Sequence, residues 1–159
     1  MIIKKNYIKK RELKELTEVC LGDHFPWFLC STTFKNDKDK QFVHLFYRKS
    51  QLNSPRFIKY CEPILNKLNP KHIVRMKLNL TWKVPRVQVQ PFHKDSDEPN
   101  LLTSIFYLNT NNGYTKFKDK KVLSEANKLI TFPSNVWHAS TTNSSSDFRL
   151  VLNIVYEAY

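Results

Sequence analysis

The apolar positions of this chain follow a helical spacing in its first part and a strand-like spacing in its second. Between Lys9 and Leu21 the apolar residues recur every three or four positions, with charged residues on the other side. A second stripe starts after a possible N-cap, Ser54, with Pro55 in the first helical position, and it continues to Leu68. Asn69 and Pro70 end it. The pattern predicts two amphipathic helices.

From Ile73 onward, short runs rich in Val, Ile, Phe, Thr and Tyr are separated by Asn, Pro, Ser and Asp clusters, which is typical of strands. Glycine is rare, so the pair Asn112-Gly113 is informative: it suits a tight turn and predicts a hairpin across it. The six predicted strands are Ile73–Thr81, Arg86–Phe92, Leu101–Leu108, Tyr114–Phe117, Lys128–Phe132 and Phe148–Tyr156.

Two helices followed by strands with no helix between them indicate a mainly β fold with flanking helices. A double-stranded β-helix, the jelly-roll or cupin-like barrel, is the expected architecture. A chain of 159 residues has the length of one domain. Within it we expect residues 1–72 to form a helical and strand buttress and residues 73–159 to form the β-helix core.

The amino-acid composition indicates in which cellular compartment the protein is expected and which partners suit it. The hydrophobic fraction is 41%, enough for a core without disulfides, and the three cysteines form no zinc-binding pattern. We therefore expect a cytoplasmic protein, with no signal peptide or membrane span. The net charge of +12 suits nucleic acid, but lysines spread along the chain also serve solubility. We expect nucleic-acid binding to be weak at most.

Three residues have the chemistry of a metal site. His93 and Asp95 are two positions apart at the end of a predicted strand, so both side chains can project to the same side. His138 follows the strand Lys128–Phe132 and a turn. Two histidines and one carboxylate are the facial triad of non-haem Fe(II), which leaves positions open for other ligands. Taken singly, each residue also has an ordinary structural explanation.

Arg149 is the fourth candidate. In Phe148–Tyr156 every second residue, starting with Phe148, is apolar, so Arg149 belongs to the opposite face, which is also mostly apolar. An unpaired guanidinium inside a barrel is costly, and the other inward-facing strands offer no Asp or Glu. A bound dicarboxylate would be a bidentate partner. The alternative is an arginine at the strand edge that faces solvent or pairs with Asp147.

Together these residues resemble the 2-oxoglutarate- and Fe(II)-dependent oxygenases, in particular small prolyl-hydroxylase-like members that include short forms carried by bacterial viruses. The resemblance covers about half of the chain. Beyond the His93-x-Asp95 pair, His138 and Arg149, it includes three segments: Ser104–Asn109, Asn112–Phe117 and Leu129–Ser134.

The resemblance implies Fe(II) held by His93, Asp95 and His138, with 2-oxoglutarate as co-substrate and O2 as oxidant. Arg149 would bind the distal carboxylate of 2-oxoglutarate, and Tyr107 stands where relatives have a co-substrate-binding tyrosine, or simply fills the core. Asn79 is a weaker candidate contact. Many relatives have a serine where this chain has Val151, and Gly-Gly where it has Asn112-Gly113. If the chain is phage-encoded, its setting is the host cytoplasm.

The expected activity is therefore that of a dioxygenase that hydroxylates an amino-acid residue and releases succinate and CO2, with a peptide, protein or amino acid as substrate. One alternative is oxidative demethylation of nucleic-acid bases, but the second arginine typical of that branch is replaced by Val155. The other alternative is a non-catalytic jelly-roll binding protein. The oligomeric state and the natural substrate are not determined by the sequence.

Overall fold

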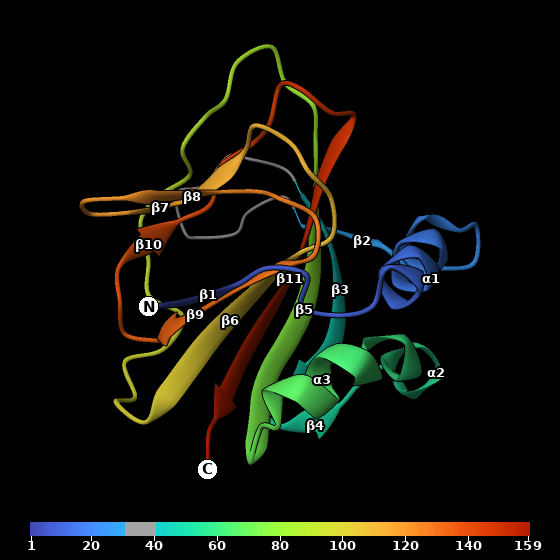
Figure 1. Ribbon diagram of the computed structural model, residues 1–159, viewed down its shortest axis with the longest axis vertical. Helices are drawn as coiled ribbons and strands as arrows, with labels where there is room; N and C mark the ends of the chain where they lie inside the picture. The colour runs from blue at the N-terminus through green and yellow to red at the C-terminus, as the bar shows by residue number, and fades with distance from the viewer. Residues whose placement is uncertain (31–40) are drawn as a thin grey trace.

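The computed structural model describes residues 1–30 and 41–159, and its centre is a large antiparallel sheet (Figure 1). The strands of this sheet follow the order β1 (Ile2–Lys4), β9 (Lys128–Pro133), β6 (Leu101–Tyr107), β11 (Phe148–Glu157), β5 (His72–Trp82), β3 (Gln41–Arg48) and β2 (Phe28–Cys30), with β4 (Gln51–Leu52) paired to β3. A second, small antiparallel sheet has the order β10 (His138–Ala139), β7 (Tyr114–Phe117) and β8 (Lys121–Leu123).

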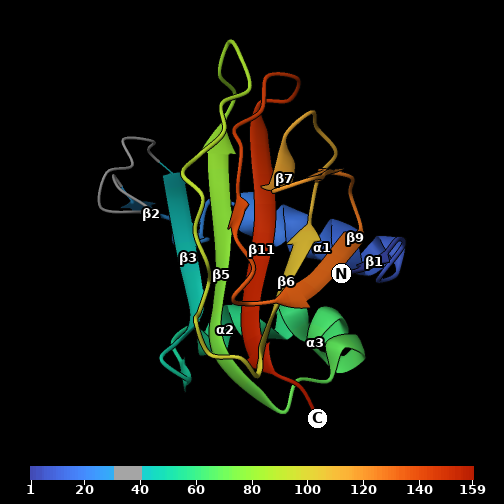
Figure 2. The same ribbon diagram turned by 90° about the vertical axis from the view of Figure 1, so that its left-hand side faces the viewer.

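The two faces of the large sheet have different neighbours. The helices α1 (Lys10–Leu21), α2 (Pro55–Ile58) and α3 (Glu62–Leu68) lie against one face, and the small sheet lies on the side of the other (Figures 1 and 2). Leu150, Leu152 and Ile154 of β11 join the core under the helices, whereas Val151 joins a second core with Phe117 of the small sheet. The predicted mainly β, jelly-roll fold with flanking helices is confirmed. The division at residue 72 stays a prediction.

The first predicted helix is confirmed as α1, but the second is broken into α2, a 3-10 turn η1 (Lys59–Cys61) and α3. Pro63, in the first turn of α3, has no N–H to continue the hydrogen bonding from the preceding turn. Ser54 is the residue before α2, but its hydroxyl bonds His44 instead of capping the helix. Asn69 ends α3 in the left-handed conformation, at φ 49°.

The predicted hairpin across Asn112-Gly113 is wrong. β6 lies between β9 and β11, whereas β7 belongs to the small sheet and forms its hairpin with β8. Gly113 does not adopt a positive φ; instead the side chain of Asn111 accepts a hydrogen bond from its N–H at 2.9 Å. The glycine is needed for another reason, a close approach of Arg149.

The predicted strand Arg86–Phe92 is also wrong, because this segment forms a single isolated bridge, Val89 with Thr141. Pro85 and Pro91 bracket it, and proline cannot donate to a strand ladder. The other five predicted strands are present, within two residues of the expected ends. Strands β1, β2, β3, β4, β8 and β10 were not predicted. Within residues 1–30 and 41–159, no helix combines the length and apolar character needed to cross a membrane.

Candidate metal centre

A backbone bridge brings the two candidate histidine ligands together. The N–H of His93 donates to the carbonyl of His138 at 2.9 Å, and the N–H of His138 donates back to His93 at 3.0 Å. The N–H of Asp95 donates to the carbonyl of Ser134 at 3.0 Å. This bond attaches the loop that contains His93 and Asp95 to the turn after β9. Hydrogen bonds between segments 40 residues apart therefore build the site.

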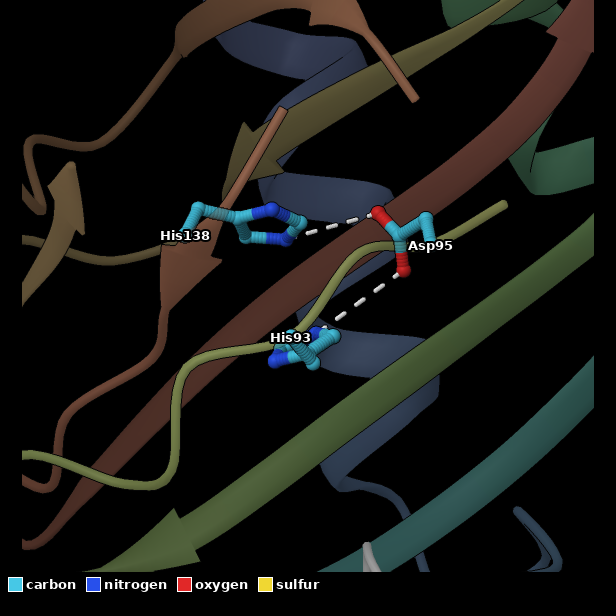
Figure 3. A group of neighbouring side chains, drawn as sticks. All are labelled: His93, Asp95 and His138. Carbon is cyan, nitrogen blue, oxygen red and sulfur yellow. Dashed lines mark ion pairs between the residues drawn. The ribbon is translucent and has the colours of Figure 1, made fainter. Parts of the chain in front are cut away.

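The three side chains converge, as Figure 3 shows. The Nε2 atoms of His93 and His138 lie 4.0 and 3.5 Å from different carboxylate oxygens of Asp95, and one ligand atom from each residue lies within 4.8 Å of the other two. The ring centroids of the two histidines are 4.5 Å apart, and the ring planes are tilted by 49° to each other. The three residues singled out in the sequence thus form one cluster.

Both histidines are oriented with Nε2 toward this cluster. Nδ1 of His138 lies 3.0 Å from the carbonyl of Val136, and Nδ1 of His93 lies 3.3 Å from the carbonyl of Pro91. Because a carbonyl only accepts, each Nδ1 carries the hydrogen, and the lone pair of the neutral ring is then on Nε2, the atom directed at Asp95. This is the arrangement in which a second interaction orients a metal-binding imidazole.

Asp95 is held by three further side chains. The hydroxyl of Thr103 donates to Oδ2 at 2.9 Å, Nδ2 of Asn153 donates to the same oxygen at 3.2 Å, and the guanidinium of Arg75 pairs with Oδ1. Burial alone would raise the pKa of Asp95, but Arg75, His138 and these hydrogen bonds together lower it below its ordinary value. The carboxylate is therefore charged at neutral pH.

The pKa of His93 is lowered to about 4, first by burial and then by the neighbouring His138. A neutral imidazole is the form that binds a metal ion. At neutral pH the cluster thus offers the neutral imidazole of His93 and the anionic carboxylate of Asp95, with Nε2 of His138 directed at the same carboxylate.

Arg149 points into the interior, as its place in the alternating strand predicted. It is 2% exposed and, within the described part of the chain, forms no ion pair with a carboxylate, so the alternative pairing with Asp147 is wrong. Its Nε donates to the hydroxyl of Ser124 and its Nη1 to that of Ser140, both at 2.9 Å. Burial lowers the pKa of the guanidinium.

Tyr107 is fully buried behind this arginine, with its ring centroid 5.8 Å from the guanidinium carbon of Arg149. The hydroxyl of Tyr107 lies 2.7 Å from that of Thr115, and Thr115 lines the cavity described next. Burial raises the pKa of Tyr107, against the opposing influence of Arg149 and Thr115. A direct co-substrate contact by Tyr107 stays a prediction.

A cavity of about 130 Å³ joins the three candidate ligands to Arg149. Its wall also includes four residues of β5 at alternating positions: Arg75, Lys77, Asn79 and Thr81. Only Asn79 was considered in the sequence. The sequence did contain a signal for the other three. Along β5 the polar residues alternate with Met76, Leu78 and Leu80, which are buried on the side of the helices, so the polar residues share the opposite face.

The residues fit a metal ion. Two ligands at right angles and about 2.1 Å from an ion are about 3 Å apart, so the separations of 3.5 and 4.0 Å need only small side-chain rotations. Two imidazoles and one carboxylate on one side of a cavity match the facial set of non-haem Fe(II), with the cavity side left for other ligands. Arg149, in the same cavity, offers a cation for a carboxylate.

No protein-family model and no curated protein sequence matches the chain. Solved structures do match. An oxidoreductase of the 2OG-Fe(II) oxygenase family from Burkholderia pseudomallei has a TM-score of 0.73 and 12% identity over 99% of this chain and 85% of that one.

Two further structures extend this comparison. A prolyl hydroxylase from Trichoplax adhaerens, in complex with a hypoxia inducible factor peptide fragment, has a TM-score of 0.69 and 11% identity over 98% of this chain and 82% of that one. The non-haem alpha-ketoglutarate-dependent epimerase SnoN of nogalamycin biosynthesis has a TM-score of 0.72 and 13% identity over 99% and 77%. At these identities the likeness concerns the fold, and the chain has the fold of the 2-oxoglutarate- and Fe(II)-dependent oxygenases.

Proposed function

We propose that this chain is an Fe(II)- and 2-oxoglutarate-dependent oxygenase that hydroxylates an amino-acid residue of a peptide or protein, or a free amino acid. The observation that carries the proposal is one cavity containing both a His-Asp-His cluster and a buried arginine without a carboxylate partner among the described residues. A barrel with a purely structural role would gain no stability from either feature, because burying these polar and charged groups without a ligand costs free energy.

His93, Asp95 and His138 would hold the Fe(II). Thr103 and Asn153 keep the carboxylate of Asp95 facing the two Nε2 atoms, and the carbonyls of Pro91 and Val136 fix the ring tautomers. Bound there with 2-oxoglutarate and O2, the iron would supply oxidative decarboxylation, which yields succinate and CO2 and transfers one oxygen atom to the substrate.

Arg149 would bind the distal carboxylate of 2-oxoglutarate. Ser124 and Ser140 hold Nε and Nη1, so the guanidinium is oriented before a ligand enters. Ile105 and Val151 line the same cavity and would exclude water from the bound co-substrate. Tyr107 contacts the same end of the cavity in two ways: its hydroxyl bonds that of Thr115, and the face of its ring lies against the guanidinium of Arg149.

A peptide substrate is supported by the structural neighbour that was solved with a peptide fragment, while the epimerase among the neighbours shows that this fold also serves other chemistry. The carboxylates of Asp97 and Glu98, in the loop after the ligand pair, disfavour a nucleic-acid backbone at this place. Cys20 and Cys61 are buried and form no disulfide with a described residue, which suits a reducing cytoplasm.

The test of the metal and co-substrate is anaerobic addition of Fe(II) and then 2-oxoglutarate. We expect a weak visible charge-transfer band that requires both additions and is absent from His138→Ala. A wild-type protein that gives no band and does not retain Fe(II) through gel filtration would contradict the proposal.

The test of the substrate class is incubation of the iron-loaded protein, in air, with cell protein extract and, separately, with methylated oligonucleotides. We expect a 2-oxoglutarate-dependent gain of one oxygen atom in a peptide or amino acid, measured by mass spectrometry. Demethylation of the oligonucleotides with no oxidised peptide or amino acid would instead support a nucleic-acid demethylase.

A further inference from the structure

The cavity contains one more cation than the proposed reaction uses. Lys77 lines its wall from the middle of β5, and it forms no hydrogen bond or ion pair with any described residue. The other three cations that line the cavity have assigned partners: Arg75 pairs with Asp95, Lys94 pairs with Asp97, and Arg149 would bind 2-oxoglutarate. Lys77 has none.

The register of the sheet separates Lys77 from Arg149. Lys77 is opposite Asn153 on β11, which bonds Asp95, whereas Arg149 is opposite Thr81. Four residues of antiparallel strand correspond to about 13 Å, so the two cations lie toward opposite ends of the cavity. A 2-oxoglutarate bound between the metal ligands and Arg149 would fill the end of the cavity that is distant from Lys77. Lys77 would then face the part of the cavity that the co-substrate leaves unfilled.

The charges in the cavity also favour an anionic ligand near Lys77. With Fe(II) at +2, Asp95 at −1, 2-oxoglutarate at −2 and Arg149 at +1, the centre is neutral. Lys94 and Asp97 cancel each other, so Arg75 and Lys77 add an excess of two positive charges. Arg75 has direct contact with a carboxylate, and part of its side chain, 31%, is exposed. Lys77 carries its positive charge at pH 7, because burial and Arg75 lower its pKa only to about 8. A poorly solvated cation that pairs with no described carboxylate favours the binding of an anion.

We propose that Lys77 is a substrate-specificity residue that binds a carboxylate of the substrate, so that the molecule oxidised is a free amino acid or an acidic residue of a peptide. This inference rests on the function proposed above and narrows its substrate class. The ammonium and the metal cluster lie at the same level of the sheet, since Lys77 is opposite the residue that bonds Asp95. The bound carboxylate would thus lie near the carbon that reacts.

The test uses the whole protein loaded with Zn(II) and 2-oxoglutarate, so that binding is measured without turnover. The probes are free L-amino acids with their carboxamides, and blocked peptides that differ only by Asp or Asn at one position. Saturation-transfer NMR gives the dissociation constants. The variants are Lys77→Met, which removes the charge at similar size, Lys77→Arg, which keeps it, and Lys121→Met as a control at an exposed lysine outside the cavity.

We expect at least one carboxylate probe to bind wild type at least about tenfold more tightly than its amide, because hydrogen bonds to charged groups contribute more than about 1.4 kcal/mol. Lys77→Met should abolish this preference, Lys77→Arg should keep part of it, and Lys121→Met should keep all of it. A preference among free amino acids alone, or among peptides alone, identifies which source of carboxylate the site takes.

Three results would overturn the inference. Carboxylate and amide probes binding equally well, or no carboxylate probe binding, would leave Lys77 without a substrate role. A Lys77→Met variant that loses affinity for 2-oxoglutarate itself would assign the lysine to the co-substrate. Failure of the wild type to bind 2-oxoglutarate in the presence of metal is a different outcome, which would contradict the proposed function as a whole.

Discussion

Gly113 and Arg149 are packed so closely that a Cβ at position 113 would collide with the arginine side chain unless something moved. A Cβ added to Gly113 would lie 2.6 Å from Cδ of Arg149, and 2.8 Å from both the carbonyl oxygen of Thr142 and Oδ1 of Asn111. The loop between β6 and β7 therefore forms one wall of the site in which the guanidinium lies. A glycine that is itself no candidate ligand thus helps to determine the direction of the proposed co-substrate arginine.

The first prediction concerns this contact. Gly113→Ala should displace Arg149 and weaken 2-oxoglutarate binding about tenfold or more, with metal binding little changed, because the backbone of Thr142 cannot easily move away. Calorimetric titration of 2-oxoglutarate into the metal-loaded protein measures this. Gly22→Ala is the control, since its Cβ would meet only carbonyl oxygens at 3.3 and 3.4 Å. Equal 2-oxoglutarate affinity in the two variants would argue against this role of Gly113.

The second prediction separates charge from shape at Arg149. Arg149→Ala should weaken 2-oxoglutarate binding by several kcal/mol, and Arg149→Lys should restore only part of it, because an ammonium cannot make the bidentate contact. The dependence of succinate production on 2-oxoglutarate concentration gives both effects. Full rescue by lysine would mean that only the positive charge is needed.

The third prediction concerns Thr103, whose hydroxyl donates to Oδ2 of Asp95 at 2.9 Å. Thr103→Val keeps the shape and removes the donor, so Fe(II) affinity should fall about 10- to 100-fold, as is usual when the partner of a metal ligand is removed. A competition titration with a chelator measures it. Thr131→Val is matched, because Thr131 bonds Ser104 on the neighbouring strand instead of Asp95. If both variants lose the same affinity, the effect is structural.

How much the sequence could predict depended on the range of the interactions. The inward direction of Arg149 followed from the strand pattern alone, since side chains alternate along a strand whatever its partners are. The convergence of His93 with His138 could not follow from local pattern, because the bridge between them joins segments with 44 residues between them. There the resemblance to a known family supplied what spacing could not.

The errors have the same origin. Asn112-Gly113 suggested a local hairpin, but β6 pairs with β9 and β11, partners that only the complete sheet defines. Arg75 and Lys77 were visible as alternating polar residues in β5, yet nothing local showed that their face lines a cavity. A polar face of a sheet is more often exposed, whereas this one lines a cavity together with the loop that contains His93 and Asp95.

The fourth prediction is a pH effect on the metal-free protein. The pKa of His93 is lowered to about 4 in the folded state, from about 6.5 when unfolded, so the folded state disfavours its protonation. The stabilisation is complete above pH 6.5 and is lost as the pH falls toward 4, by at most about 2 kcal/mol at pH 5. Urea unfolding at pH 5 and 7 should show a smaller difference for His93→Gln than for wild type. His24→Gln, at an exposed histidine, should keep the wild-type difference.

The fifth prediction is that Lys77→Met makes the ligand-free protein more stable at pH 7. The pKa of Lys77 is lowered from about 10.5 to about 8 on folding, first by burial, so the protonated form costs the folded state at most about 3 kcal/mol below pH 8. Wild-type stability should therefore rise between pH 8 and 10.5, and this rise should be absent from Lys77→Met. Thermal unfolding across this range measures both effects.

Lys128→Met provides the opposite case for this fifth prediction. Lys128 is also buried, but its ammonium pairs with Glu125 at 3.0 Å and donates to the carbonyl of Leu123 at 2.8 Å, so its loss should destabilise the protein. A residue that binds a charged ligand is expected to destabilise the protein when the ligand is absent, because selection for function tolerates such a cost. A Lys77→Met protein no more stable than wild type would indicate that Lys77 is already well solvated, which would remove the physical reason for it to bind a substrate carboxylate.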